Sequence, residues 1–335
     1  MAITVVAGGF FGDEGKGKIV SYLALKDKVS IAVRTGSVNA GHTVLWRGET
    51  YKLRLIPSAF IYEKARLLIG AGANVNVKIF FNEAEKTNTK NRVGIDYQAS
   101  IIEEKHIKED RGSKYLSKKI GTTGQGVGPA IAERVRRSAK LAKEIKELEP
   151  YLTDVSEEIY EASERGENIL LEGTQATFIS LYHGTYPYVT SRDTTASAIC
   201  SEAGVGPTKI DDVILVFKAY VTRVGAGPLP GEITIQEAEK RGWLERATVA
   251  GRTRRAAPFN YQLAKKAVRL NGATQIALTK IDVLYPECKN AKRYEELTEE
   301  AKRFIQKIED ELKVPVTFIG TGPEAESIID LRSER

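Results

Sequence analysis

Apolar residues gather along this chain in short runs rich in valine, isoleucine and leucine, and each run is followed by a polar or glycine-bearing segment. The first run, Ile3 to Ala7, stops at Gly8-Gly9. A short β-branched run bounded by glycine is typical of a strand buried on both faces. The same pattern predicts further strands over residues 30–34, 66–69, 168–171, 213–217, 274–279 and 314–319.

Between these runs, apolar residues recur every three or four positions, which predicts helices. We expect helices over residues 18–25, 130–138 and 297–312, and an amphipathic helix from Leu141 to Ala162 that is interrupted or bent at Pro150. Strands that alternate with helices predict an α/β fold with a large, mostly parallel central sheet flanked by helices. We take residues 1–335 as a single α/β domain, with ligands at the carboxyl edge of its sheet.

The glycine-rich stretch Gly12-Asp-Glu-Gly-Lys-Gly-Lys18 follows the first predicted strand, so it predicts a P-loop-like phosphate loop. Main-chain N–H groups of such a loop can point at one anion, and Lys16 and Lys18 would add mobile positive charge. Ile19 stands where the P-loop pattern has a magnesium-binding Ser or Thr. A metal held here therefore needs another ligand, and Asp13 is the nearest carboxylate.

Several other predicted strands end in loops that could carry chemistry. His42 lies in a polar segment from Thr35 to Thr43, without the apolar neighbours of a core histidine. The glycines of residues 121–129 form a second candidate anion cradle, although the arginines that follow also fit a solvated helix face. Residues 172–177 and 190–195 are rich in hydroxyl and amide groups, and residues 251–255 hold a cluster of arginines suited to carboxylates or phosphates.

Lys280-Ile-Asp282 follows the predicted strand at 274–279. A carboxylate there can accept hydrogen bonds from the ring N–H and the 2-amino group of guanine, which adenine does not offer in that arrangement. The spacing is similar to the Asn-Lys-x-Asp signature of GTP-binding proteins, with Thr279 in place of Asn. The segment therefore favours guanine over adenine, although an exposed strand end would look the same.

Composition narrows the class of protein. With 42% hydrophobic and 28% charged residues, the chain fits a soluble globular protein, and it lacks the run of about 18 apolar residues that a membrane span requires. Without a signal pattern we expect a cytoplasmic protein that binds no membrane. Cys200 and Cys288 lack the spacing of a redox or metal pair. The net charge of +6 fits polyanionic small ligands as well as nucleic acid, and no aromatic and basic platform for nucleic acid is present.

Taken together, an acid in a phosphate loop, a histidine in a neighbouring loop and a guanine reader suggest phosphoryl transfer. Seven ordered blocks closely resemble adenylosuccinate synthetase, the GTP-dependent ligase family that joins IMP to aspartate in purine biosynthesis. The blocks span nearly the whole chain: Gly12 to Lys18, Asn39-Ala-Gly-His-Thr43, Gly121-Thr-Thr-Gly124, His183 to Thr190, Gly251-Arg-Thr-Arg-Arg255, Thr279 to Asp282 and Thr321-Gly-Pro323.

The resemblance implies a two-step reaction. Asp13 takes the proton from N1 of IMP, so that the 6-oxygen attacks the γ-phosphate of GTP. His42 stabilises the transferring group, Lys16 assists, and the amine of aspartate then displaces phosphate from 6-phosphoryl-IMP. The metal would be Mg²⁺, held by Asp13 and the carbonyl of Gly41. Arg137 is expected to reach the IMP of a partner subunit, which implies a homodimer.

The resemblance also implies three sets of binding residues. Those for GTP are Gly12, Glu14, Gly15, Gly17, Lys18, Gly41, His42, Thr43, Arg254, Lys280, Ile281, Asp282, Gly320, Thr321 and Gly322. Those for IMP are Asp13, Lys16, Asn39, Ala40, Gly41, His42, Thr123, Arg137, Gln175, Thr190 and Arg252. Those for aspartate are Thr248, Val249, Ala250, Gly251, Arg252 and Arg254, although family members usually carry a Thr-Thr pair immediately before this glycine.

A hypothesis from another class stays open at this point. A GTP-binding switch would use the same phosphate loop and Lys280-Ile-Asp282 without ligase chemistry. The two hypotheses differ in when GTP is consumed. A ligase needs IMP and aspartate together, whereas a switch hydrolyses GTP slowly whether or not they are present.

Overall fold

One ten-stranded sheet organises the computed structural model, which describes residues 2–245, 251 and 253–334. Every neighbouring pair in it is parallel except β15 with β16, at one edge of the sheet. Its spatial order is β16 (Ile328–Asp330), β15 (Val316–Gly320), β14 (Gln275–Thr279), β11 (Asp212–Lys218), β1 (Ile3–Gly8), β10 (Ile169–Glu172), β2 (Ile31–Arg34), β5 (Arg66–Ile69), β7 (Val93–Asp96) and β9 (Leu152–Thr153). The predicted fold class is confirmed, and each predicted strand agrees with an observed one to within two residues.

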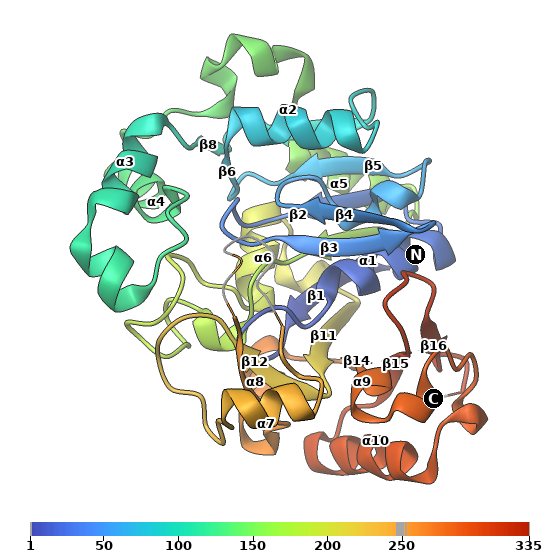
Figure 1. Ribbon diagram of the computed structural model, residues 1–335. Helices are drawn as coiled ribbons and strands as arrows, with labels where there is room; N and C mark the ends of the chain where they lie inside the picture. The colour runs from blue at the N-terminus through green and yellow to red at the C-terminus, as the bar shows by residue number, and fades with distance from the viewer. Residues whose placement is uncertain (1, 246–250, 252, 335) are drawn as a thin grey trace.

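Helices cover both faces of this sheet (Figure 1). Among the described residues they are α1 (Lys16–Lys26), α2 (Val77–Lys86), α3 (Glu104–Gly112), α4 (Val127–Arg136), α5 (Val155–Glu164), α6 (Ala196–Ala203), α7 (Ile235–Lys240), α8 (Tyr261–Asn271), α9 (Ile281–Leu284) and α10 (Glu299–Leu312). No helix in these ranges is long and apolar enough to cross a lipid bilayer. Side-chain N-caps at Asn76, Asp154, Thr234, Asn260 and Thr298 fix where α2, α5, α7, α8 and α10 begin.

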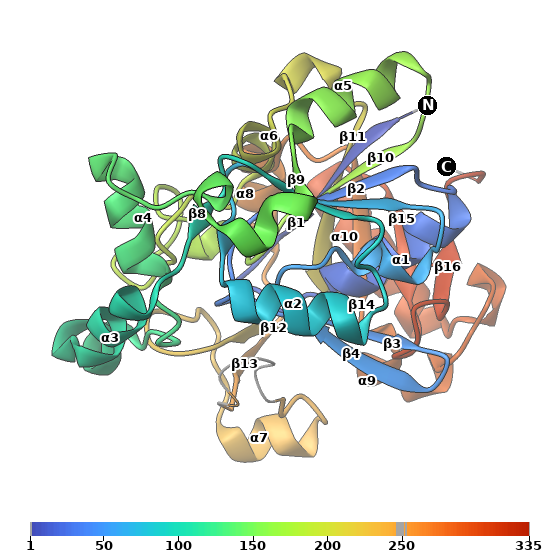
Figure 2. The same ribbon diagram turned by 90° about the horizontal axis from the view of Figure 1, so that it is seen from above.

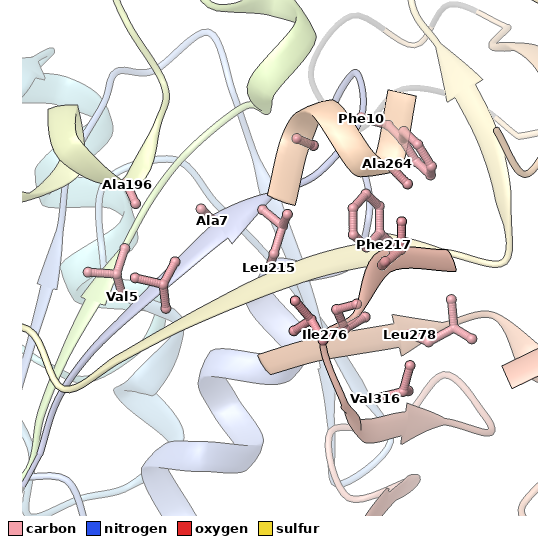
Figure 3. Packing of buried hydrophobic residues seen from close by; sticks show 14 of the residues in the cluster. Val5, Ala7, Phe10, Ala196, Leu215, Phe217, Ala264, Ile276, Leu278 and Val316 are labelled. Atoms are coloured by element: carbon pink, nitrogen blue, oxygen red, sulfur yellow. The ribbon is translucent and has the colours of Figure 1, made fainter. Parts of the chain in front are cut away.

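Two apolar cores lie on opposite faces of the sheet because successive side chains of a strand point to opposite sides. Val5 and Ala7 of β1 belong to the core under α5, α6, α8 and α10, whereas Val6 belongs to the core under α1 and α2. Figure 3 shows the first core, which combines side chains of β1, β11, β14 and β15 with Ala264 of α8. Burial on both faces explains why these strands read as continuous apolar runs in the sequence.

The predicted helix from Leu141 to Ala162 is wrong over its first half. Residues 142–144 and 146–151 form 3₁₀ turns, β9 joins the edge of the sheet, and α-helix begins only at Val155. Pro150 has no N–H to donate, and its ring blocks a continuous α-helix. Of the predicted apolar positions in this half, Leu148 is fully buried, whereas Leu141, Ile145 and Leu152 are only half-buried. The spacing therefore predicted burial only in part and helix type incorrectly.

Smaller elements beside the sheet complete the fold, and sequence reasoning missed most of them. β3 (His42–Trp46) and β4 (Glu49–Leu53) form a hairpin, β6 (Asn74–Val75) pairs with β8 (Ser100–Ile101), and β12 (Tyr220–Arg223) pairs with β13 (Arg255–Pro258). In Figures 1 and 2, α3 and α4 lie together to one side of the sheet. Figure 2 shows α7 beside the β12–β13 pair.

Candidate active site

A cavity of about 990 Å³ opens at the carboxyl ends of the central strands. That volume is at the upper end of the range for small-molecule sites, so it suits more than one ligand. Predicted site residues that line it are Gly12, Asp13, Glu14, Gly15, Lys16, Gly17, Lys18, Asn39, Ala40, Gly41, His42, Thr43, Thr123, Gln175, Thr190, Arg254, Lys280, Asp282 and Gly322. The fold thus gathers residues that are up to three hundred positions apart in the sequence.

Some predicted residues are placed elsewhere. Ile281, Gly320 and Thr321 lie behind the lining and are buried, whereas Arg137 and Gly251 are exposed and do not line the cavity. Arg137 ends α4 in a left-handed conformation, which is a common helix termination. The predicted contacts of Thr248, Val249, Ala250 and Arg252 lie outside the described residues.

The backbone of the phosphate loop is held in an unusual conformation. Gly15, at the N-cap of α1, has a φ of 90°, which glycine adopts at little cost. Asp13 has a φ of 62°, and Gln175 and Lys280 share this left-handed region at 63° and 65°. Non-glycine residues pay a penalty there and concentrate at functional sites. Each of these three residues closely follows the end of a sheet strand and faces the cavity.

The loop lysines are fixed, which corrects the expectation of mobile charge. Lys16 Nζ lies 2.8 Å from Glu14 Oε2, and both side chains are buried. Glu14 Oε1 accepts hydrogen bonds from the N–H groups of Phe10 and Gly12, so it occupies part of the predicted anion cradle. Lys18 Nζ donates to the carbonyl oxygens of Gly322 and Ser327 at 2.6 and 2.7 Å, and burial lowers its pKa to about 7.

Three residues predicted to bind IMP form one polar group. Gln175 Nε2 donates to Thr190 Oγ1 at 2.7 Å and to Asn39 Oδ1 at 3.3 Å. Asn39 Nδ2 is 3.4 Å from the same Thr190 hydroxyl. These side chains come from the ends of β2 and β10 and from the loop before α6, and they hold one another in place with donors and acceptors facing the cavity.

His42, the first residue of β3, sits against a buried carboxylate. Its Nδ1 lies 2.5 Å from Glu172 Oε1, and Arg34 Nη1 donates to the same oxygen at 2.8 Å. Burial, helped by the charge of Arg34, lowers the pKa of His42 to about 4. Burial opposes ionisation of Glu172 as well, but Arg34 and the hydrogen bonds it accepts outweigh that effect and hold its pKa at about 2.

Asp13 belongs to a second network of charges. Arg254 Nε lies 2.9 Å from Asp13 Oδ2, and Arg254 Nη1 also contacts Glu245, a residue that lines the cavity. Glu245 contacts the Lys218 ammonium at 3.1 Å as well. Burial raises the pKa of the Asp13 carboxyl above its ordinary value, and Arg254 only partly counters this. A carboxylate with a raised pKa is a stronger base, which suits proton abstraction.

The predicted guanine reader is open to the cavity. Asp282 Oδ1 is buried and has no hydrogen-bond partner among the residues that the structure describes. Thr279, which replaces the Asn of the signature, instead donates its hydroxyl proton to the carbonyl of Glu14 at 2.6 Å. Thr279 thereby ties the phosphate loop to the end of β14. A buried acceptor without a partner costs free energy, which a ligand with N–H groups would recover.

Two places in the described part of the chain bring together groups that could bind a metal. Asp13 and Gly41 offer a carboxylate and a carbonyl on the cavity wall, the ligand types that Mg²⁺ prefers. Glu103, His106 and Glu133 also cluster, between α3 and α4. There, however, His106 Nδ1 accepts from the N–H of Glu103, its Nε2 lies 2.8 Å from Glu133, and Lys105 bridges the two acids. That cluster is a satisfied ion-pair network.

Sequence reasoning gave no role to Arg34, Glu172, Lys218 and Glu245. The first three share one signal, because each is a charged residue at the carboxyl end of a buried parallel strand. Glu245 lies in an irregular segment after α7, so its place in the sequence does not mark it as a residue of the site.

Comparisons with known proteins concern the sequence and the fold of the whole chain. The sequence model of the family described as adenylosuccinate synthetase matches residues 5–147 and 138–287. The adenylosuccinate synthetase of Archaeoglobus fulgidus is 53% identical to this chain over 336 residues, which span all of both chains. That of Methanocaldococcus jannaschii is 54% identical over 338 residues, which span all of this chain and 98% of the relative. The structure of fully ligated adenylosuccinate synthetase from Plasmodium falciparum matches with a TM-score of 0.90 at 26% identity, covering 98% of this chain and all of that one. A cyanophage succinoaminodeoxyadenylate synthetase bound to dGMP and dATP shares the fold at 22% identity, with a TM-score of 0.82 over 98% of this chain and 95% of that one. The chain belongs to the adenylosuccinate synthetase family.

Proposed function

We propose that the chain joins IMP to L-aspartate at the expense of GTP, giving adenylosuccinate, GDP and phosphate, and that the described site residues perform this reaction. It is the first committed step from IMP to AMP in purine biosynthesis. The observation that carries the proposal is that Asp13, His42 and Asp282 share one cavity. A base, a phosphoryl-facing ring nitrogen and a guanine acceptor are the three groups that this reaction needs.

In the first step Asp13 removes the proton from N1 of IMP, and the electron pair moves to the 6-oxygen. That oxygen attacks the γ-phosphorus of GTP, and the bond to the bridging oxygen of GDP breaks. His42 Nε2, which is buried and has no hydrogen-bond partner among the described residues, faces the place for the transferring group and stabilises its charge. Lys16, held by Glu14, adds positive charge.

In the second step the amine of aspartate attacks C6 of the resulting 6-phosphoryl-IMP. The C6–O bond breaks, phosphate leaves with its electron pair, and the amine loses a proton. The guanidinium of Arg254 is the described cation suited to the aspartate carboxylates or the GTP phosphates. Asn39, Thr123, Gln175 and Thr190 would hold IMP.

The donors on the cavity wall fit a magnesium ion. Asp13 and the carbonyl of Gly41 would hold Mg²⁺, which when bound neutralises charge on the nucleotide phosphates. We further propose a homodimer in which Arg137 serves the partner's IMP, and a single domain spanning 1–335. We place the enzyme in the cytoplasm, since Cys200 and Cys288 are buried free thiols, as a reducing compartment favours.

The direct test is an absorbance assay for adenylosuccinate with IMP, GTP, Mg²⁺ and aspartate, omitting each in turn. The proposal expects product only in the complete mixture. Steady GTP hydrolysis without IMP or aspartate would instead support the GTP-binding switch. Replacing the pair GTP and IMP by dATP and dGMP tests the specificity of the cyanophage protein, and we expect little product because Asp282 is suited to guanine in the donor site.

Subunit sharing has its own test. We mix equal amounts of an Arg137→Ala variant and an Asp13→Asn variant, each inactive alone. If Arg137 acts across the interface, half of the dimers are mixed and each has one intact site, so activity recovers to about a quarter of the wild-type level. No recovery, with exchange of subunits shown independently, would mean that each chain uses its own Arg137.

A further inference from the structure

Glu172 is a fully buried carboxylate whose two oxygens are both engaged. Oε1 lies 2.8 Å from Arg34 Nη1, 2.5 Å from His42 Nδ1 and 2.6 Å from the Ser58 hydroxyl, while Oε2 accepts from the Ser58 N–H at 2.7 Å. Arg34 and Glu172 are direct partners in the parallel register of β2 and β10. Two neighbouring strands therefore supply a balanced charge pair beneath the cavity.

This arrangement determines how the ring of His42 is oriented. An ionised carboxylate can only accept hydrogen bonds, so a ring nitrogen 2.5 Å from Glu172 must carry a proton. The proton is therefore on Nδ1. The opposite nitrogen, Nε2, is buried, has no hydrogen-bond partner within the described ranges, and belongs to a residue of the cavity wall.

The surroundings leave the ring little room to turn. A Cβ atom at Gly17 would stand 2.8 Å from His42 Cβ and 3.0 Å from the Ser58 hydroxyl, which shows how closely the first turn of α1 packs on both residues. Arg34 also lies against the ring, with its Nη1 3.2 Å from Nδ1. Moving the proton from Nδ1 to Nε2 would place a bare nitrogen against the Glu172 carboxylate, and turning the ring by 180° would place Cδ2 there instead.

We infer that Glu172 is a positioning residue for phosphoryl transfer: it holds the proton of His42 on Nδ1 and thereby presents Nε2 to the transferring phosphoryl group, with Arg34 balancing its charge. This inference rests on the proposed function, which assigns the phosphoryl contact. The competing explanation is a buried ion pair that serves stability alone. In that case the tautomer of His42 would be incidental, and loss of Glu172 would affect folding more than turnover.

The first test reads the tautomer without any ligand. With ¹⁵N-labelled histidine, the chain gives signals from only His42, His106 and His183, which His106→Gln and His183→Gln variants assign. His106 is an internal reference for the opposite tautomer, because its Nδ1 accepts a hydrogen bond from a backbone N–H and its proton is therefore on Nε2. We expect a protonated Nδ1 at His42. A bare Nδ1 would overturn the inference.

The second test compares two buried glutamates. Glu172→Gln should lower kcat about 100-fold, change KM for IMP and GTP less than about threefold, and produce a mixture of His42 tautomers. Glu83→Gln is the matched control, because Glu83 is also buried but, within the described part of the chain, accepts only from backbone N–H groups of residues 54–56. Its kcat and the His42 tautomer should stay at wild-type values.

The outcomes separate the two hypotheses. Wild-type kcat in Glu172→Gln, or equal losses in both variants, would assign Glu172 to stability alone. If Glu172→Gln does not fold, the wild-type tautomer still tests whether Glu172 holds the proton on Nδ1, because a bare Nδ1 would overturn the inference. If the wild-type chain lacks ligase activity, the proposed function fails, while the tautomer measurement still reports whether Glu172 orients the ring.

Discussion

The two charged regions of the cavity differ in how their charges are balanced. Around His42, Glu172 is neutralised by Arg34 from the adjacent strand, and neither of these buried side chains lines the cavity. Around Asp13, the cations that contact the carboxylates are themselves candidates for binding substrate, since Arg254 spans Asp13 and Glu245. The charge of Glu172 is therefore balanced before ligands arrive. We expect the second region to exchange ion pairs when anionic ligands bind.

This difference follows from the elements that build each region. Glu172 and Arg34 are the last residues of central strands, where both faces are packed. Glu245 belongs to an irregular segment and is partly exposed. Groups fixed by a sheet can be preorganised for charge that develops during reaction, whereas groups on loops can change partners. We therefore expect substitutions near His42 to affect turnover and substitutions near Asp13 to affect both binding and turnover, with Asp13 itself the exception.

The largest effect on activity is expected from substitution of Asp13. Asp13→Asn removes the base but keeps the size of the side chain, so kcat should fall about a thousandfold while the Kd for GTP changes less than about threefold. Steady-state assays measure kcat, and isothermal titration calorimetry measures the Kd for GTP. Turnover near the wild-type rate in this variant would take the base role away from Asp13.

The next largest effect concerns the nucleotide base. Asp282→Asn replaces an acceptor by a group that also presents N–H donors to guanine, so the ratio of kcat/KM for GTP over ATP should fall about 100-fold. Asp310→Asn on the exposed face of α10 is the matched control and should leave the ratio unchanged. Unaltered discrimination in Asp282→Asn would show that guanine is read elsewhere.

A smaller effect is expected in stability. The folded-state pKa of Glu172, about 2, lies below its ordinary value of 4.5, so its contribution is complete above pH 4.5 and is lost as pH falls toward 2. Between pH 5 and pH 3 this loss amounts to about 2 kcal/mol of unfolding free energy. Urea unfolding across this range should show a shallower pH dependence in Glu172→Gln than in the wild type or in Glu83→Gln. Parallel curves would contradict the assignment of a buried, ionised Glu172.

The contrast between sheet residues and loop residues also explains which parts of the fold and the site could be predicted from the sequence. Strands such as β5 (Arg66–Ile69) were predicted to the residue because burial on both faces leaves a continuous apolar run. The hairpin of β3 and β4 was missed, because the polar segment around His42 hides its start. The loop residues of the site were recognisable from glycine and charge. Glu172 was not assigned a role because its partners, Arg34 and His42, are more than a hundred positions away in the sequence.

Lys18 shows the limit of a motif. Its register matches the lysine of a P-loop, which contacts phosphates, yet its ammonium is bound to the carbonyl oxygens of Gly322 and Ser327. In this position it fastens the start of α1 to the segment after β15, next to Asp282. The motif predicted correctly that this loop lies at the carboxyl edge of the sheet, where it lines the cavity, but the partner of this side chain depends on a segment three hundred residues away.

The smallest effect is therefore expected at Lys18. Lys18→Met loses two hydrogen bonds that hold the guanine side of the site, so KM for GTP should rise about tenfold, with kcat and KM for IMP within about twofold of the wild type. Lys26→Met, at the exposed end of the same helix, should change none of these constants. If Lys18 instead binds the γ-phosphate, its charge acts on the transition state, and kcat must fall by more than KM for GTP rises. Whether KM for GTP or kcat changes more thus decides whether this lysine supports the guanine side of the site or contacts the phosphates.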